Sequence, residues 1–343
     1  MSFSNLTDRE EEILQSLIEH YIATAEPVGS RVIANKYKMG LSPATIRNTL
    51  QDLEEMGLVN QPHTSAGRVP TDKGYRIYVD SLLEPEGLTL SEQEQIEKEI
   101  TLDYAAVEDL LEQTSHILGI VSKQLGVTVA PRFDQGILTR IDLIPVAEKQ
   151  ILVVLAVKSG LVRSILLEVD SPLEGSDLEE TKRLLNERLC GLSLGSIREN
   201  ADQRVRDVSS GNPKLVKLFL DSKDSIFSSV GFDQVHLGGT TNILSQPEFK
   251  NYDRLKPLIS LIEEKKLLAQ LFAAKGIKEG ITVTIGKEIE RGEMESCSLV
   301  TSRYEAGELG GMIGIIGPTR MRYSKLVSLV DYTAKLLSGI LSK

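Results

Sequence analysis

The sequence predicts a multidomain α+β protein whose residues 1–83 form a winged helix-turn-helix. Three short helix patterns followed by two strand patterns around residues 58–70 predict this first domain. Further along the chain, two groups of β-type runs flank a long helical interval. Strands on both sides of such an interval predict one α+β domain that carries an insertion.

Length and composition are those of an acidic globular chain. The chain has 343 residues, 41% of them hydrophobic, which is enough for two or three domains with real cores. Its net charge of -10 argues against unspecific coating of nucleic acid. An acidic protein can nevertheless carry one basic face, so the net charge does not exclude DNA binding.

Several signals that would indicate another compartment or class are missing from the sequence. No apolar run reaches membrane-spanning length, and residues 1–5 lack the basic and apolar regions of a signal peptide. Cys190 and Cys297 are far apart without CxxC spacing, and the four histidines are scattered. We therefore expect a cytoplasmic protein without a membrane partner, a bound metal or a cofactor.

The first two helices are predicted from caps and apolar spacing. Thr7 and Glu10 have the spacing of a capping box. The apolar residues that follow repeat with helical period and predict a buried face: Ile13, Leu14, Leu17, Ile18 and Tyr21. Ser30 is the expected N-cap of a second short helix, and Gly40 provides the backbone freedom for a tight corner before the third.

The third helix has the polarity of a DNA-reading helix. Ser42 followed by Pro43 predicts its start, because a proline loses no hydrogen bond at the first helical position. Its inward face carries Ile46, Leu50 and Leu53, and its outward face carries Thr45, Arg47, Asn48 and Gln51. Acidic residues occur only in its later turns, as expected for a helix that enters the major groove by its N-terminal end.

A polar helix face by itself is more often merely solvated. Here the context favours DNA, because residues 27–51 contain four basic residues and no acidic one within an acidic protein. The side-chain types also match base edges, since arginine pairs with guanine and asparagine or glutamine pairs with adenine.

The segment after the third helix is predicted to form the wing and a helix that packs on the domain. Gly57 is the expected C-cap of the third helix. One wing strand is expected to start at Leu58 and the second near Arg68, with a tip of small residues between them. Arg68 adds a positive charge at the base of this tip. Thr71 is the expected cap of the next helix, whose apolar face would be Tyr75, Tyr78, Val79 and Leu82. For Lys73 and Arg76, phosphate contact and a solvated surface position are equally compatible with the sequence.

The rest of the chain alternates between helical and β-type patterns. Residues 84–90 are expected to be a linker. A capping box at Ser91 and Glu94 then starts a helical pattern that reaches about Leu125. The apolar stripe of this pattern is either internal core or, less commonly, a contact surface between two chains. β-type runs at 136–145, 150–157 and 161–169 predict an antiparallel meander. Three further strands are expected at 281–285, 296–303 and 311–316, and an amphipathic helix is expected at 323–341.

Three runs, at residues 25–31, 42–48 and 65–76, resemble the HrcA family of heat-inducible transcription repressors. The resemblance implies a GAF-like domain that carries an inserted dimerising domain. Together with the patterns above it gives these expected boundaries: 1–83 winged helix, 84–103 linker and start of a helix, 104–172 GAF-like first part, 173–230 insertion, and 231–343 GAF-like second part.

The resemblance also implies a function. It implies a dimeric repressor of heat-shock operons that binds an inverted-repeat operator in double-stranded DNA, the CIRCE element, and that depends on a GroEL-type chaperonin. Carried over by position, the base-reading candidates are Thr45, Arg47, Asn48 and Gln51, and the candidates for contacts with the DNA backbone are Ser42, Ser65, Gly67, Arg68 and Tyr75.

Two other functional classes remain open from the sequence. One is a regulator that senses a small molecule in the GAF-like domain, and the other is a scaffold whose winged helix binds proteins, although proteins give no reason to exclude acidic residues. Gly238-Gly239-Thr240-Thr241 lacks the lysine and the strand-to-helix setting of a phosphate loop, so we expect a turn there. No nucleophile-and-base set is evident, and we expect no enzyme.

Overall fold

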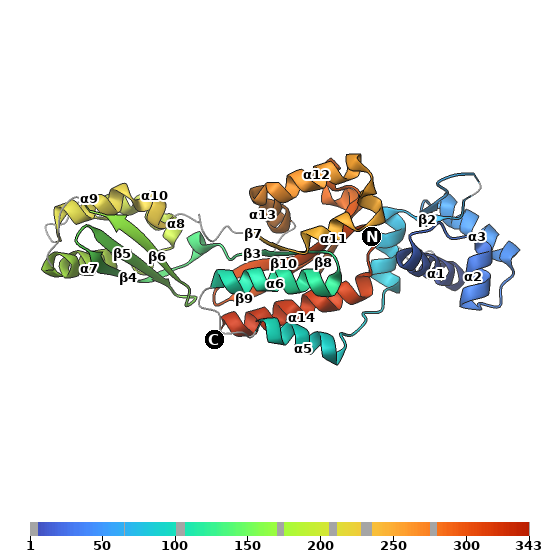
Figure 1. The fold of residues 1–343 in the computed structure, drawn as a ribbon, viewed down its shortest axis with the longest axis horizontal. Coiled ribbons are helices and arrows are strands. Elements are labelled where there is room, and N and C mark those ends of the chain that lie inside the picture. The colour runs from blue at the N-terminus through green and yellow to red at the C-terminus, as the bar shows by residue number, and fades with distance from the viewer. Residues whose placement is uncertain are drawn as a thin grey trace. The chain divides into compact units, whose positions relative to one another are not determined.

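A computed structural model describes residues 6–64, 66–100, 107–169, 175–205, 211–227, 235–274 and 280–342. The chain divides into two compact units, shown in Figure 1, which are described separately below. The first comprises Met1–Thr128, His236–Ser302 and Ile313–Ala334, and the second comprises Val129–Val235, Arg303–Met312 and Lys335–Lys343. Among the described helices, none combines the length and apolar character needed to cross a membrane.

The first unit begins with the winged helix-turn-helix predicted from the sequence. Its elements are α1 (Asp8–Thr24), α2 (Ser30–Tyr37), α3 (Pro43–Glu55), β1 (Val59–Asn60), β2 (Val69–Pro70), α4 (Asp72–Ile77) and a π-helical turn at Tyr78–Leu82. The Thr7–Glu10 capping box is present, and the two wing strands pair antiparallel. Gly40 takes the positive φ of 69° that the corner before α3 requires.

Two predicted helix starts differ from the structure. The N-cap of α2 is Gly29, and Ser30 is already helical. In α5 (Leu90–Ile100) the helix starts one residue before Ser91, so the capping box forms at Thr89 and Glu92. There the Thr89 backbone N–H donates to Glu92 Oε2 at 3.0 Å, and the Glu92 N–H donates to Thr89 Oγ1 at 3.3 Å.

A five-stranded sheet with the order β7-β3-β10-β9-β8 organises the rest of the first unit. Its strands are β3 (Leu125–Val129), β7 (Val235–Gly238), β8 (Ile281–Ile285), β9 (Cys297–Ala306) and β10 (Leu309–Pro318). The helices of this region are α6 (Val107–Ser122), α11 (Thr240–Leu244), α12 (Tyr252–Glu263), α13 (Lys265–Ala274) and α14 (Tyr323–Leu341). Figure 1 shows α6 and α14 on one side of the sheet and α12 and α13 on the other.

The apolar stripe of α6 is internal core, as the commoner of the two interpretations predicted. Leu111, Thr114 and Leu118 have no solvent-exposed surface. The stripe does not continue to Leu125, because the chain leaves the helix at Ser122 and Leu125 starts β3, a strand that the sequence analysis missed. A Cβ atom at Gly238 would lie 2.2 Å from the Ser115 carbonyl oxygen, so glycine is what allows α6 to lie against β7.

The Gly238–Thr241 run does have a strand-to-helix setting, which corrects our expectation. Gly239, with a φ of 76°, connects β7 directly to α11. The loop is tied to α6 and to the turn before β3 by Asn242, whose Nδ2 donates to the carbonyl oxygens of Gly119 (2.9 Å) and Gln124 (3.0 Å). The run therefore joins two packed elements.

The second unit contains the predicted meander as a separate antiparallel sheet with the order β4-β5-β6. Its strands are β4 (Leu138–Ala147), β5 (Gln150–Val157) and β6 (Val162–Glu168), and its helices are α7 (Gly175–Leu189), α8 (Leu194–Val205), α9 (Pro213–Asp221) and α10 (Lys223–Phe227). Asn186 of α7 protects the edge strand: its Oδ1 accepts from Ile141 N at 2.9 Å and its Nδ2 donates to Ile141 O at 2.7 Å.

The boundary of this unit differs from the expected insertion at 173–230. The unit begins at Val129, so the meander lies with α7–α10 and outside the first unit. The expected boundary depended on where the helical pattern begins. Strand alternation looks alike in either sheet, so the pattern could not assign the meander.

Candidate DNA interface

The start of α3 is fixed by its cap, and its orientation is fixed by the core. Ser42 Oγ accepts a hydrogen bond from Thr45 N at 3.1 Å and lies 2.9 Å from Thr45 Oγ1. On the inner side Ile46, Leu50 and Leu53 are buried, as predicted. The opposite side of the helix must therefore face away from the domain.

Three of the four base-reading candidates share that outward surface. Arg47, Asn48 and Gln51 are exposed, whereas Thr45 is half-buried beside the cap. Gln51 Nε2 donates to Glu55 Oε1 at 3.3 Å, a weak exposed contact that a stronger acceptor can displace. The helix thus presents one arginine and two amides toward solvent over its first two turns.

A polar hollow of about 410 Å³ lies beside this surface. It is lined from three elements: the start of α2, the outward side of α3 and the wing. Its lining includes Ser30, Arg47, Gln61, Thr64, Gly67 and Arg68. A hollow bounded by a reading helix and a wing is where the backbone of a duplex would pass if the helix entered the major groove.

The start of α2 adds donors to this hollow. Gly29, its N-cap, has no side chain that could satisfy the first backbone N–H groups of the helix. Gly29 and Ser30 both line the hollow, and the first turn of α2 contains no acidic residue. Free N–H groups and the positive end of the helix dipole favour an anion such as a phosphate.

The wing is held against the start of α2 by backbone contacts. Val28 N donates to Arg68 O at 2.8 Å, and Arg68 N donates to Val28 O at 2.9 Å. A Cβ atom at Gly67 would lie 2.4 Å from the Val28 carbonyl carbon. Gly67 is therefore required for this close approach, whether or not it also contacts DNA.

Gln61 closes the wing, a role that the sequence analysis missed. Its Nε2 donates to the carbonyl oxygens of Thr64 (3.0 Å) and Ala66 (2.9 Å). A glutamine at the end of a short strand carries no recognisable sequence signal, because its partners are backbone atoms of the loop. Ser65, one of the expected backbone contacts, lies outside the described residues.

Arg68 is placed at the base of the wing, but its charge is already paired. Its Nη2 lies 2.8 Å from Glu54 Oε2 near the end of α3, and its side chain is only 18% exposed. Its Nε is buried without a partner among the described residues. The arrangement fixes the wing to α3 and leaves Arg68 poorly placed to neutralise a phosphate.

Tyr75 does not lie at the interface, which corrects our expectation. The residue is 2% exposed, and its ring centroid lies 5.9 Å from that of Tyr323. Burial raises the pKa of its hydroxyl, which has no hydrogen-bond partner among the described residues. A side chain in this position cannot reach a phosphate.

Two more basic residues have structural partners. Arg76 forms ion pairs with Asp80 at 2.9 Å and with Glu288 at 2.5 Å, so it is a structural residue and not a phosphate contact. Lys73 is exposed, and its Nζ donates to Met56 O at 2.9 Å, next to the last turn of α3. This position favours a cation because the carbonyl end of the helix dipole is negative.

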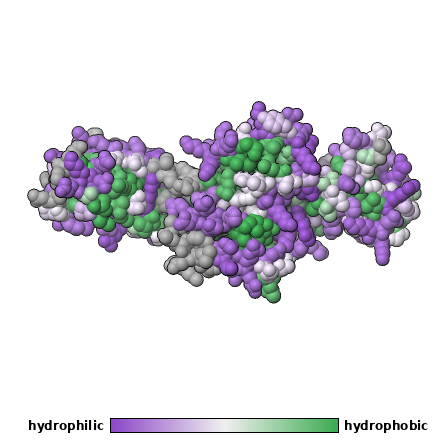
Figure 2. All heavy atoms as spheres, viewed as in Figure 1, coloured by the Kyte–Doolittle hydropathy of each residue, from purple (hydrophilic) through white to green (hydrophobic). Residues whose placement is uncertain are grey.

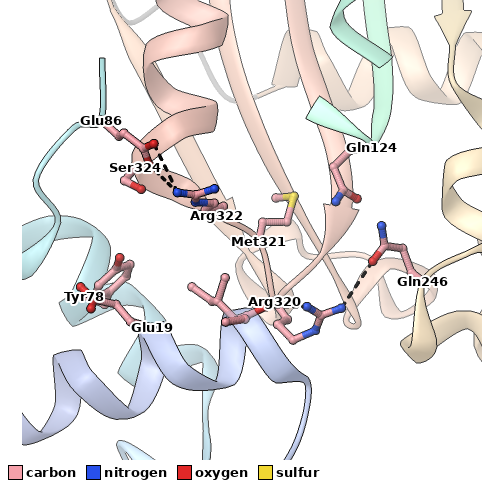
Figure 3. A pocket seen from close by; sticks show the side chains of 11 residues that line it. Glu19, Tyr78, Glu86, Gln124, Gln246, Arg320, Met321, Arg322 and Ser324 are labelled. Carbon is pink, nitrogen blue, oxygen red and sulfur yellow. Dashed lines mark hydrogen bonds and ion pairs between the residues drawn. The ribbon is translucent and has the colours of Figure 1, made fainter. Parts of the chain in front are cut away.

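A second hollow, of about 510 Å³, lies away from the reading helix and is shown in Figure 3. Both of its arginines are paired: Arg320 with Glu248 at 2.6 Å and Arg322 with Glu86 at 3.0 Å. The amide of Gln246 lies 3.4 Å from Arg320 Nη2. Pairing satisfies both arginines, so the described lining offers no unpaired cation to an anionic ligand.

Comparisons with known proteins agree with the geometry of the first domain. A family model described as "Winged helix-turn-helix transcription repressor, HrcA DNA-binding" matches residues 5–81, and one described as "HrcA protein C terminal domain" matches residues 108–327.

Full-length relatives carry the same name. Proteins called "Heat-inducible transcription repressor HrcA" from Pelotomaculum thermopropionicum and Geobacter sulfurreducens are 39% and 40% identical to this chain. The alignments cover 98% of this chain in both cases, and 97% and 99% of the relatives. A crystal structure titled only as a hypothetical protein superposes with a TM-score of 0.67 at 25% identity, covering 98% of this chain and 99% of that one.

Proposed function

Because this chain belongs to the HrcA family of heat-inducible transcription repressors, we propose that it represses chaperone operons as a homodimer bound to an inverted-repeat operator of the CIRCE type. Each winged helix would read one half-site, since a two-fold symmetric protein matches a two-fold symmetric site. The family is one of repressors and not of enzymes.

One observation carries the DNA-binding proposal. Arg47, Asn48 and Gln51 are exposed together beside a polar hollow lined by the start of α2 and by the wing. In the proposal these three side chains and Thr45 contact base edges, while Ser42, Gly67 and the N–H groups at the start of α2 contact the DNA backbone. Arg68 has a supporting role, because it holds the wing in place against α3.

A sheet face in the second unit supports the homodimer. On one face of the β4-β5-β6 sheet, four apolar side chains are 45–58% exposed: Ile144, Val146, Val162 and Leu166. The register places Leu152 of β5 between Ile144 and Leu166, which forms one apolar row across all three strands. The next row on this face, which includes Asp142 and Ser164, separates that row from Val162. Figure 2 shows hydrophobic residues gathered on this unit. Such a surface is rare on monomers and suits a second copy of the chain.

Control by a GroEL-type chaperonin is supported by family membership alone. We propose that the chaperonin maintains the DNA-binding form, so that unfolded proteins, by occupying the chaperonin, relieve repression. The expected result is that added chaperonin raises the fraction of the purified repressor that is competent to bind the operator. An unchanged competent fraction, measured by titration with excess operator, would refute this part of the proposal.

The DNA-binding proposal is tested by operator titration with matched variants. Arg47→Ala and Asn48→Ala should each weaken binding to the intact operator by about 1–3 kcal/mol, with little effect on a scrambled duplex. Arg183→Ala is the control, because Arg183 is an exposed arginine of α7 in the other unit. If a folded Arg47→Ala protein keeps the affinity and sequence preference of the unchanged chain, the assignment of the reading face is wrong.

A further inference from the structure

We infer that a polar junction behind the DNA-binding domain sets the direction in which α3 points, and that Arg76, Glu288 and Arg320 are its positioning residues. The junction joins α1 and α4 to the domain of the five-stranded sheet, all within the first unit. This inference rests on the proposed function, because a fixed direction matters only when two reading helices bind one operator together.

The first contact of the junction is made by Arg76 of α4. Its Nε and Nη2 donate to the two carboxylate oxygens of Glu288, at 2.8 and 2.5 Å, and Nη2 also donates to Val283 O at 2.7 Å. The two side chains are 21% and 36% exposed. A two-pronged guanidinium–carboxylate contact fixes direction as well as distance, which a single hydrogen bond does not.

The turn that carries Glu288 is itself fitted to α4. Glu288 Oε2 accepts from Ile285 N at 2.9 Å, and Asp72 Oδ2 at the start of α4 accepts from Lys287 N at 3.1 Å. A Cβ atom at Gly286 would lie 2.3 Å from the same Asp72 oxygen, and the φ of Gly286 is 52°. The backbone of this turn therefore lies against the α4 carboxylate with no room for a side chain.

The second contact is made by Arg320, between β10 and α14, whose side chain is labelled in Figure 3. Its Nη1 donates to Ile22 O in the last turn of α1 at 2.7 Å, while its Nε donates to Glu248 Oε1 at 2.6 Å. The last turn of α1 has no basic residue of its own. Arg320 therefore supplies, from the sheet domain, the cation that a helix C-terminus favours.

The linker between the domains is held as well. Glu86 N donates to Ser324 O at 3.1 Å, and the Glu86 carboxylate pairs with Arg322. Between the two arginine contacts the buried rings of Tyr75 and Tyr323 meet. The winged helix is thus held at α1, at α4 and at the linker.

These contacts position the reading face without covering it. The junction uses the end of α1 and one side of α4, whereas Arg47, Asn48 and Gln51 on α3 stay exposed. Two linked modules gain affinity for a two-part site only when their geometry allows both to bind together. A junction that fixes each module in advance therefore favours the intact operator and one half-site spacing.

The test compares an intact operator with a single half-site, using Arg76→Gln, Glu288→Gln and the double variant in the full-length chain. Each variant should bind the intact operator about tenfold more weakly, keep its half-site affinity, and tolerate a lengthened half-site spacing better than the unchanged chain. The double variant should be no weaker than either single one, because both remove the same contact. Arg183→Gln, at an exposed pair in α7, is the control.

Three results would overturn the inference: unchanged affinity for the intact operator, tighter binding by the variants, or an equal loss on the half-site and the intact operator. If Arg76→Gln fails to fold, which circular dichroism would show, Glu288→Gln decides, since it keeps an acceptor for Ile285 N. Failure of the proposed function looks different, because the unchanged chain would then show no preference for the operator over a scrambled duplex.

Discussion

The Arg68 guanidinium at the base of the wing lies 2.8 Å from the Glu54 carboxylate of α3, so the charge of this arginine is neutralised within the protein. To contact a phosphate, Arg68 would first have to give up its pairing with Glu54, which offsets part of the attraction to DNA. Arg68 therefore fixes the wing relative to α3 more than it attracts DNA.

Arg68→Gln should lower operator affinity by loosening the wing while leaving the salt dependence of binding nearly unchanged. Arg47→Gln, by contrast, removes an exposed cation that the proposal places at a base edge, so the log–log slope should fall by less than the roughly 0.9 that one neutralised phosphate contributes. The measurement is operator affinity at several salt concentrations for both variants and the unchanged chain. A slope reduced by about one unit in Arg68→Gln would show that Arg68 leaves Glu54 and binds a phosphate.

Ser42 offers a way to separate folding from DNA contact. Ser42→Ala removes the oxygen that accepts from Thr45 N, and should cost about 1 kcal/mol of unfolding free energy. Ser42→Asp keeps an acceptor and suits the positive end of the helix, so it should preserve stability while its charge weakens operator binding. Urea unfolding and operator titration check the two effects. Wild-type affinity in Ser42→Asp would place Ser42 away from the DNA backbone.

The local pattern of the first domain predicted its elements well, for a physical reason. Caps, apolar spacing and turn glycines are short-range signals, and Ser42, Ile46 and Gly40 act within a few residues of themselves. The same applies to β8 and α14, whose predicted and observed bounds coincide. Arg76 and Tyr75 could not be assigned in this way, because their partners, Glu288 and Tyr323, are more than two hundred residues away in the chain.

The domain boundary shows a second gap in what sequence can predict. A meander of alternating strands has the same pattern in any sheet, so nothing in residues 138–168 tells which core they join. Similarly, β3 was hidden because Leu125 continues the helical spacing of α6. What makes this segment a strand is its place between β7 and β10 in the sheet, and glycine at 126 allows its close approach to α6, where a Cβ atom would lie 2.2 Å from Ser115 O.

Tyr75→Phe should keep operator affinity and raise stability, by about 1 kcal/mol or slightly more. The buried hydroxyl has no partner among the described residues, and an unpaired buried polar group costs free energy that phenylalanine avoids. Thermal and urea unfolding measure the gain, and operator titration checks affinity. A clear loss of stability would mean that the hydroxyl is hydrogen-bonded, for example to a buried water.

The apolar face of the β4-β5-β6 sheet predicts how the dimer can be broken without unfolding the chain. Leu166→Glu and Val162→Glu replace side chains that are about half exposed, so each variant should still fold. A carboxylate in an apolar interface should instead disfavour the association of two chains. Sedimentation analysis should show monomers at concentrations where the unchanged chain and the Arg183→Glu control are dimers. Because a monomer carries one reading helix, its affinity for an intact operator should fall to that for a half-site. Dimers that persist in both variants would locate the interface on another surface.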